Sequence, residues 1–110
     1  MTTGKARNVE FKRKLWSEPG ECRWCRCPLK FEHATVDHVW PLGLGGEHAL
    51  ANMVIACYRC NQERNQLQIL AVMKRKASKG VKRYSKIAAR MEKEMAHLID
   101  KWGPLFQKKE

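Results

Sequence analysis

Four of the five cysteines stand in two hooks of identical spacing, Cys22-x2-Cys25 and Cys57-x2-Cys60. A CxxC turn places two sulfur atoms on one side of a tetrahedron, and Zn²⁺ takes four such atoms at about 2.3 Å. The two hooks therefore predict one Zn²⁺, which is structural because all four ligand positions are filled. Redox disulfides are the alternative, and they are rare in a reducing compartment. Cys27 is interpreted as a spare thiol, although Cys25-x-Cys27 could compete as a hook.

The segment between the hooks carries side chains that hydrolysis of a phosphodiester requires. This reaction needs an activated water molecule and a Lewis acid on the anionic phosphate. Neutral imidazole is suited to accept a proton near pH 7, so His38 is the candidate general base. Asp37 precedes it, and a regular strand would turn the two side chains to opposite sides. Asn52 and Asn61 are the other polar candidates in this region. Each candidate also has a purely structural interpretation: a solvated Asp-His pair, an ordinary turn residue at Asn52 and a helix N-cap at Asn61.

The stretch VDHVWPLGLGGEHALANMVIACYRCNQERN, together with the first hook, resembles the HNH endonuclease family over about residues 22–65. The matching parts are a DH pair, a Gly-Gly loop, a middle Asn and a final residue beside the second hook. That final residue is Asn61 rather than His, an HNN-type variant that many members of the family share. The resemblance implies an α+β fold, namely a small ββα-metal (His-Me finger) core with a four-cysteine zinc site and flanking helices.

The resemblance also implies roles for individual residues. Asp37 and Asn61 would supply oxygen ligands to one Mg²⁺ or Mn²⁺, His38 would act as the general base, and Asn52 would orient the loop and the base. Two protein ligands leave room for water and phosphate oxygens, as Mg²⁺ prefers. Arg64 lies one helical turn beyond Asn61, which places it to hold a phosphate oxygen.

These residues need two strands and a helix to position them. Residues 34–40 (ATVDHVW) and 52–56 (NMVIA) are rich in β-branched residues and predict strands that pair across a glycine-rich loop. A helical pattern begins at Asn61 and ends near Gly80. A short helix is expected over about residues 8–16.

Residues 81–102 predict one long helix with an apolar seam. The seam positions are spaced 4, 3, 4, 3 and 4 residues apart: Tyr84, Ala88, Met91, Met95, Leu98 and Trp102. One interpretation is packing on the chain's own core. The other is a homodimer formed through this helix.

The charge distribution favours a polyanionic partner. The formal net charge is +11, from 22 Lys and Arg against 11 Asp and Glu. No acidic residue occurs from residue 64 through residue 91, a span for which we predict contact with DNA. The predicted DNA-contact residues are Arg64, Lys74, Arg75, Lys76, Lys79, Lys82 and Arg83, and Lys86 and Arg90 continue the run.

We expect a single domain over residues 1–110, with a core at about 22–73 and a basic helical region at about 74–102. The chain has no apolar run long enough to span a membrane, and its N-terminal region lacks the apolar stretch of a secretory signal. A cytoplasmic protein is therefore expected, including a phage-encoded one that acts in the host cytoplasm. The leading hypothesis is a metal-dependent DNA endonuclease. The alternatives are a non-catalytic zinc-containing nucleic-acid-binding module and a dimeric interaction protein.

Overall fold

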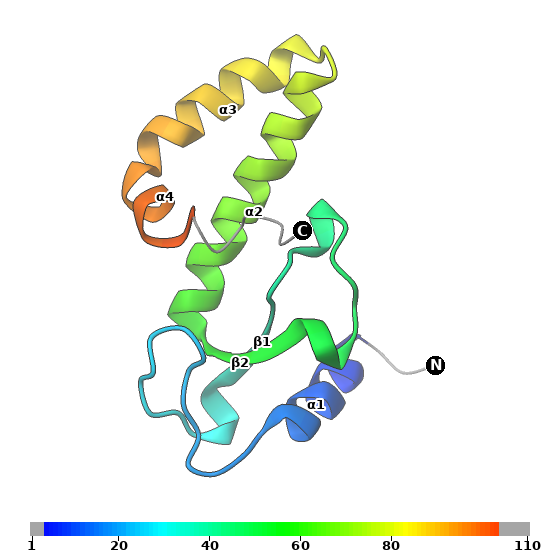
Figure 1. Ribbon diagram of the computed structural model, residues 1–110, viewed down its shortest axis with the longest axis vertical. Helices are drawn as coiled ribbons and strands as arrows, with labels where there is room; N and C mark the ends of the chain where they lie inside the picture. The colour runs from blue at the N-terminus through cyan, green and yellow to red at the C-terminus, as the bar shows by residue number, and fades with distance from the viewer. Residues whose placement is uncertain (1–3, 104–110) are drawn as a thin grey trace.

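The computed structural model describes residues 4–103, so residues 1–3 and 104–110 of the predicted domain lie outside the described residues (Figure 1). The elements follow in the order α1 (Gly4–Leu15), η1 (Phe31–His33), β1 (Ala34–His38), η2 (Leu42–Leu44), η3 (Leu50–Asn52), β2 (Met53–Cys57), α2 (Tyr58–Ser78), α3 (Lys82–Glu94) and α4 (Ala96–Trp102). The predicted α+β class is confirmed.

The two strands form an antiparallel pair, as the β-branched runs predict. Val36 lies opposite Ile55, and His38 lies opposite Met53. The first strand ends at His38 rather than at residue 40. Beyond it, the backbone N–H of Val39 still donates to the carbonyl of Asn52, and the backbone N–H of Trp40 donates to Oδ1 of the same residue.

Helix α2 begins at Tyr58, three residues before the predicted start at Asn61. The sulfur of Cys57 accepts a hydrogen bond from the backbone N–H of Cys60, so the second hook itself caps the helix. At the other end the chain reverses at Gly80, whose φ of 92° favours glycine. Because Cys57 caps the helix, the second hook and the first turn of α2 are one continuous unit. Helix α1 starts earlier than predicted and ends one residue sooner.

The predicted single helix over residues 81–102 is wrong, because the chain breaks at Met95 into α3 and α4. Met95 has φ −107° and ψ 18°, outside the helical range. The break turns α4 back toward α2, and this turn buries Leu98 and Trp102, each with 4% of its surface exposed. The seam thus packs on the chain's own core, as the first interpretation holds. The homodimer stays a prediction that needs a different surface.

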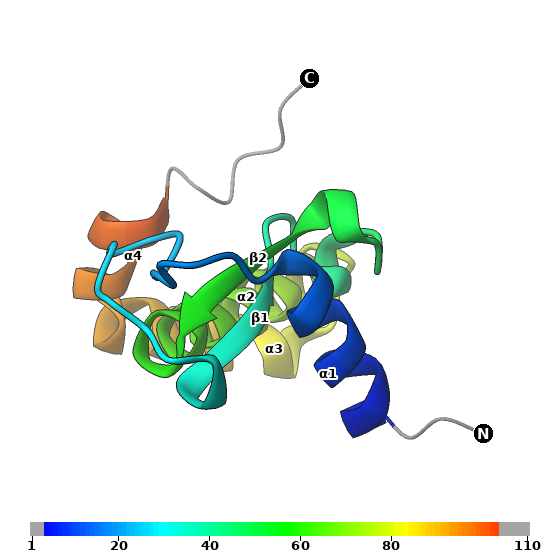
Figure 2. The ribbon, with the colours of Figure 1, turned by 90° about the horizontal axis from the view of Figure 1, so that it is seen from below.

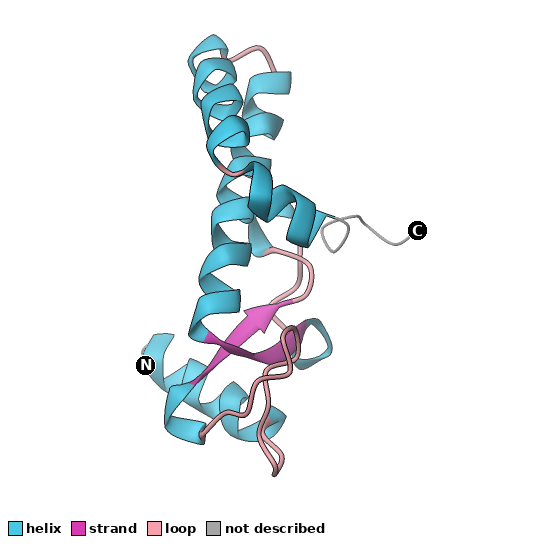
Figure 3. Cartoon of the chain, turned by 90° about the vertical axis from the view of Figure 1, so that its left-hand side faces the viewer, coloured by secondary structure: helices cyan, strands magenta, loops and turns pink. Residues whose placement is uncertain are grey.

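The molecule has two parts, a long helical hairpin and a small sheet at the base of α2 (Figure 3). The apolar core runs through both parts, from Leu67, Leu70 and Leu98 in the helices to Ala56 and Cys60 at the foot of α2. Helix α1 lies beside the two strands (Figure 2). Among the described residues, the helices include none with both the length and the apolar character needed to cross a membrane.

Candidate functional site

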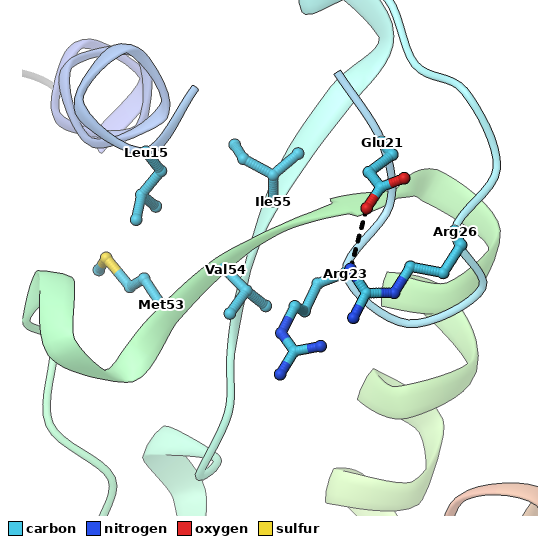
Figure 4. Close-up of a pocket in the computed structure, with 7 residues that line it drawn as sticks. All are labelled: Leu15, Glu21, Arg23, Arg26, Met53, Val54 and Ile55. Atoms are coloured by element: carbon cyan, nitrogen blue, oxygen red, sulfur yellow. Dashed lines mark hydrogen bonds and ion pairs between the residues drawn. The ribbon is translucent and has the colours of Figure 1, made fainter. Parts of the chain in front are cut away.

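The four hook cysteines converge as predicted, because each hook is attached to β2. The first hook runs beside the strand, with the backbone N–H of Arg23 donating to the carbonyl of Ile55 at 2.9 Å. The second hook continues directly from the end of β2. Figure 4 shows the first hook beside this strand, where Glu21 pairs with Arg26 at 2.9 Å. Arg26 takes a left-handed conformation with φ 65°, which turns the chain back after the hook.

The sulfur atoms of Cys22, Cys25, Cys57 and Cys60 all lie within 4.8 Å of one another. Four atoms at about 2.3 Å from a shared centre would be about 3.8 Å apart, and the sulfurs of Cys25 and Cys57 are 3.9 Å apart. Backbone N–H groups donate to the sulfurs of Cys22 and Cys57, as thiolate ligands require. The cluster therefore fits Zn²⁺. Cys27 stands outside the group of four.

The thiol pKa values differ across the hooks. A backbone hydrogen bond from Cys27 is the main cause that lowers the pKa of Cys25 to about 6. Burial raises the pKa of Cys60, and the hydrogen bond to Cys25 raises the pKa of Cys27 to about 12. The lowered pKa of Cys25 favours its thiolate, the form that binds metal.

Arg64 occupies the centre of the site. Its side chain is 1% exposed, and its Nε donates to Oδ2 of Asp37 at 2.6 Å. Its Nη2 donates to the carbonyls of His38 and Val39. The guanidinium lies 4.0 Å from the ring centre of Trp24. The structure therefore corrects the expectation that Arg64 holds a phosphate, because its guanidinium is enclosed by protein.

Asp37 and His38 point to opposite sides of β1, as a regular strand requires. Asp37 is 9% exposed, and its Oδ2 accepts a second hydrogen bond from the Nε1 of Trp24 at 2.9 Å. His38 is half-buried on the other side, where its Nε2 lies 3.0 Å from Nδ1 of His48. Phe11 of α1 stacks edge-on against His48 at 5.0 Å. His48 of the glycine-rich loop thus contacts the candidate base, and Phe11 of α1 packs behind His48. The spacing of residues along the sequence does not reveal these contacts.

Asn52 joins the two ends of the glycine-rich loop. Its Oδ1 accepts from the backbone N–H of Trp40, and its Nδ2 donates to the carbonyls of Trp40 and Glu47. Gly46 is required in the same loop, because a Cβ there would lie 1.9 Å from the carbonyl oxygen of Trp40. The loop that carries His48 is consequently held in one shape.

Asn61, on the first turn of α2, reaches across to β1. Its Nδ2 donates to Oγ1 of Thr35 at 2.9 Å and to the carbonyl of Val36 at 3.2 Å. Both contacts use the amide nitrogen, and an amide oxygen is the atom of this side chain that can bind a cation. Asp37 and His38 are residues of β1, and Asn61 contacts the same strand. Within residues 4–103, no hydrogen bond joins these three side chains to one another.

The other predicted DNA-contact residues lie at the opposite end of the hairpin formed by α2 and α3 (Figure 1). They are all exposed: Lys74, Arg75, Lys76, Lys79, Lys82 and Arg83. Lys74 pairs with Glu92 of α3, and Lys76 lies over the ring of Tyr84. The structure places these cations on the surface and does not bring them to Asn61.

Comparison with known proteins identifies the sequence between and around the hooks. Residues 22–72 match the family model described as HNH endonuclease. The CRISPR-associated endonuclease Cas9 of Corynebacterium diphtheriae is 31% identical over 62 residues, which are 56% of this chain and 6% of that protein. The chain therefore spans a small fraction of that relative. No solved structure matches it significantly. The predicted resemblance to HNH endonucleases is confirmed over residues 22–72.

The zinc cluster predicts different outcomes for two cysteine substitutions. Cys57→Ser removes one of the four converging sulfurs while the serine hydroxyl can still cap α2, so we expect loss of bound zinc and of cooperative unfolding. Cys27→Ser is the matched control, and it should keep one zinc ion per chain. Zinc content by atomic absorption and thermal unfolding measure both effects. Wild-type zinc content in Cys57→Ser would contradict the assignment.

The buried ion pair predicts a large effect of Arg64→Met on stability. The substitution leaves the carboxylate of Asp37 buried without its cation, which should lower the free energy of unfolding by about 3–5 kcal/mol. Arg59→Met is the control on the same helix, because Arg59 is 83% exposed and its pair with Glu63 should contribute about 0–1 kcal/mol. Urea unfolding of the zinc-loaded proteins separates the two, and equal losses would refute the structural role of Arg64.

Proposed function

We propose that this protein is a divalent-metal-dependent endonuclease that hydrolyses phosphodiester bonds of DNA, with His38 as its general base. The match to HNH endonucleases over residues 22–72 carries this proposal, because it includes both hooks and all four predicted site residues, Asp37, His38, Asn52 and Asn61. The placement of His38 against His48 of the glycine-rich loop supports it. A cytoplasmic location remains part of the proposal, since the hooks need reduced thiols.

His38 is held in a position that suits proton transfer. In the tautomer that carries its proton on Nε2, it donates to Nδ1 of His48 and leaves its own Nδ1 with a lone pair. That nitrogen would take the proton from the attacking water. Arg64 donates to the carbonyl of His38, and this contact fixes the backbone that carries the base. A buried side chain, Arg64, thus positions the half-exposed imidazole of His38 through the backbone of β1.

Asp37 and Asn61 would hold the catalytic Mg²⁺ or Mn²⁺. A carboxylate and an amide oxygen are the donors that such hard cations take. Oδ2 of Asp37 already accepts from Arg64 and Trp24, so the cation would share this carboxylate with them. The bound cation would offset negative charge on the scissile phosphate.

The exposed cations of α2 and α3 would bind DNA phosphates away from the cut. They face solvent, and an unbroken run of positive charge is offset by a polyanion. They therefore extend the proposed contact along the helical hairpin. Such contacts position a duplex without reading its sequence.

The alternative function is a non-catalytic zinc-containing module that binds nucleic acid. One observation favours it, namely that Asp37 is 9% exposed and already paired with Arg64. A carboxylate in this state can serve stability alone, and the basic surface would still bind DNA.

A nicking assay decides between the two functions. The zinc-loaded protein is incubated with supercoiled plasmid and Mg²⁺ or Mn²⁺, and we expect nicked product only when the metal is added. His38→Ala should lower the rate by at least about 100-fold, because proton transfer contributes that much. His97→Ala, at an exposed position in α4, is the matched control and should retain activity. Binding without nicking in either metal would favour the non-catalytic module.

The pH dependence of nicking tests the role of His38 separately. Burial, followed by the charge of His48, lowers the pKa of His38 below its ordinary 6.5, against the opposing effect of Asp37. A base must be neutral, so the rate should be level above about pH 7 and fall as the pH drops through that lowered pKa. Initial rates between about pH 5 and 8 measure this. A level profile over the whole range would speak against His38 as the base.

A further inference from the structure

We propose that α1 forms a second wall of the substrate groove and that Lys12 binds a phosphate group of the DNA strand there. The proposal rests on the nuclease function above. The groove has a volume of about 320 Å³ and lies between α1 and β1, beside the start of α2. It is lined by Val9, Lys12, Ala34, Thr35, Val36 and Asn61. Helix α1 lies outside residues 22–72, so the family match assigns it no role.

Lys12 brings a positive charge into this groove without a carboxylate to neutralise it. Its Nζ lies 4.4 Å from the ring centre of Phe31, which holds the side chain half-buried. Within residues 4–103, no carboxylate forms an ion pair with it. Lys14, two residues further along α1, is exposed and pairs with Glu10 at 3.7 Å. The cation at the groove is thus the one that an anionic ligand could complement.

The opposite wall suits a nucleic-acid backbone. Asn61 and Thr35 form its polar part, where Nδ2 of Asn61 donates to Oγ1 of Thr35 and that hydroxyl donates to the carbonyl of Ala56. Because these donors are used within the protein, the ammonium of Lys12 is the group that meets a phosphate oxygen. Val9, Ala34 and Val36 supply an apolar surface on which a sugar ring can rest. An ammonium beside a small apolar surface fits a phosphodiester strand rather than a small apolar ligand.

The groove is adjacent to the candidate base. Val36 and His38 are two residues apart on β1, so they project on the same side about 6.6 Å apart. Helix α1 contacts both places, since Lys12 lines the groove and Phe11 packs on His48, the partner of His38. A strand lying in the groove would therefore pass the base, and Lys12 would hold a phosphate next to the scissile one.

Salt-dependent binding tests the proposal with the full zinc-loaded chain. The probe is a labelled DNA duplex of about 25 base pairs, without added Mg²⁺ or Mn²⁺. Lys12→Met should reduce the slope of log K against log salt by about 0.9, the value for one phosphate contact. With Mn²⁺ added, it should raise KM for cleavage severalfold and change kcat less. Lys14→Met removes the same charge from the same helix and should leave the slope unchanged.

Equal slopes for Lys12→Met and Lys14→Met would overturn the proposal. Phe31→Leu removes the aromatic contact but keeps the cation, so it controls for any loss of packing. A fall in slope as large in Phe31→Leu as in Lys12→Met would also overturn it. Failure of the nuclease function is distinguishable. If Lys12→Met reduces the salt slope but no nicking depends on His38, the groove is a DNA site and the proposed hydrolysis is rejected. If nicking depends on His38 but Lys12→Met leaves the salt slope unchanged, only the groove is rejected.

Discussion

The ion pair between Arg64 and Asp37 is the constraint on which the rest of this structure depends. Only 1% of the arginine side chain and 11% of the aspartate side chain are exposed. Removing such charges from water costs several kcal/mol for each ion, so the pair persists only with excellent geometry and further hydrogen bonds. The indole N–H of Trp24 and the carbonyls of His38 and Val39 complete those bonds. One buried guanidinium thereby fixes α2, β1 and the first cysteine hook relative to one another.

The sulfur cluster, which fits Zn²⁺, and the ion pair meet at the same junction. The start of α2 supplies Cys60 to the sulfur cluster, Asn61 to the backbone of β1 and Arg64 to Asp37. These three contacts come from little more than one helical turn, and together they fix the orientation of that turn relative to β1. Trp102 of α4 packs edge-on against Trp24 of the first hook, so α4 covers the ion pair between Arg64 and Asp37. A small core thus gains rigidity where the proposed chemistry needs it.

Asp37 and His38 meet different surroundings on the two sides of β1. The side that carries Asp37 is closed by aromatic rings and the guanidinium, whereas the side that carries His38 opens toward the glycine-rich loop and α1. Alternation along the strand makes this division unavoidable. It also leaves His38, the proposed base, half-exposed on a strand whose other side is held by buried contacts.

Local spacing by itself predicted the cysteine cluster, the likeness to HNH endonucleases and the strand pair. Equal CxxC hooks encode a tetrahedral thiol site, a DH pair before a Gly-Gly loop indicates the HNH-type core, and β-branched runs predict the hairpin, because each signal lies within a few neighbouring residues. Only the tertiary structure decided that Arg64 is buried, that His48 meets His38, and that the last predicted helix breaks at Met95. These features depend on segments distant in sequence closing over one another. The free energy of burying a side chain depends on that closure and not on its neighbours along the chain.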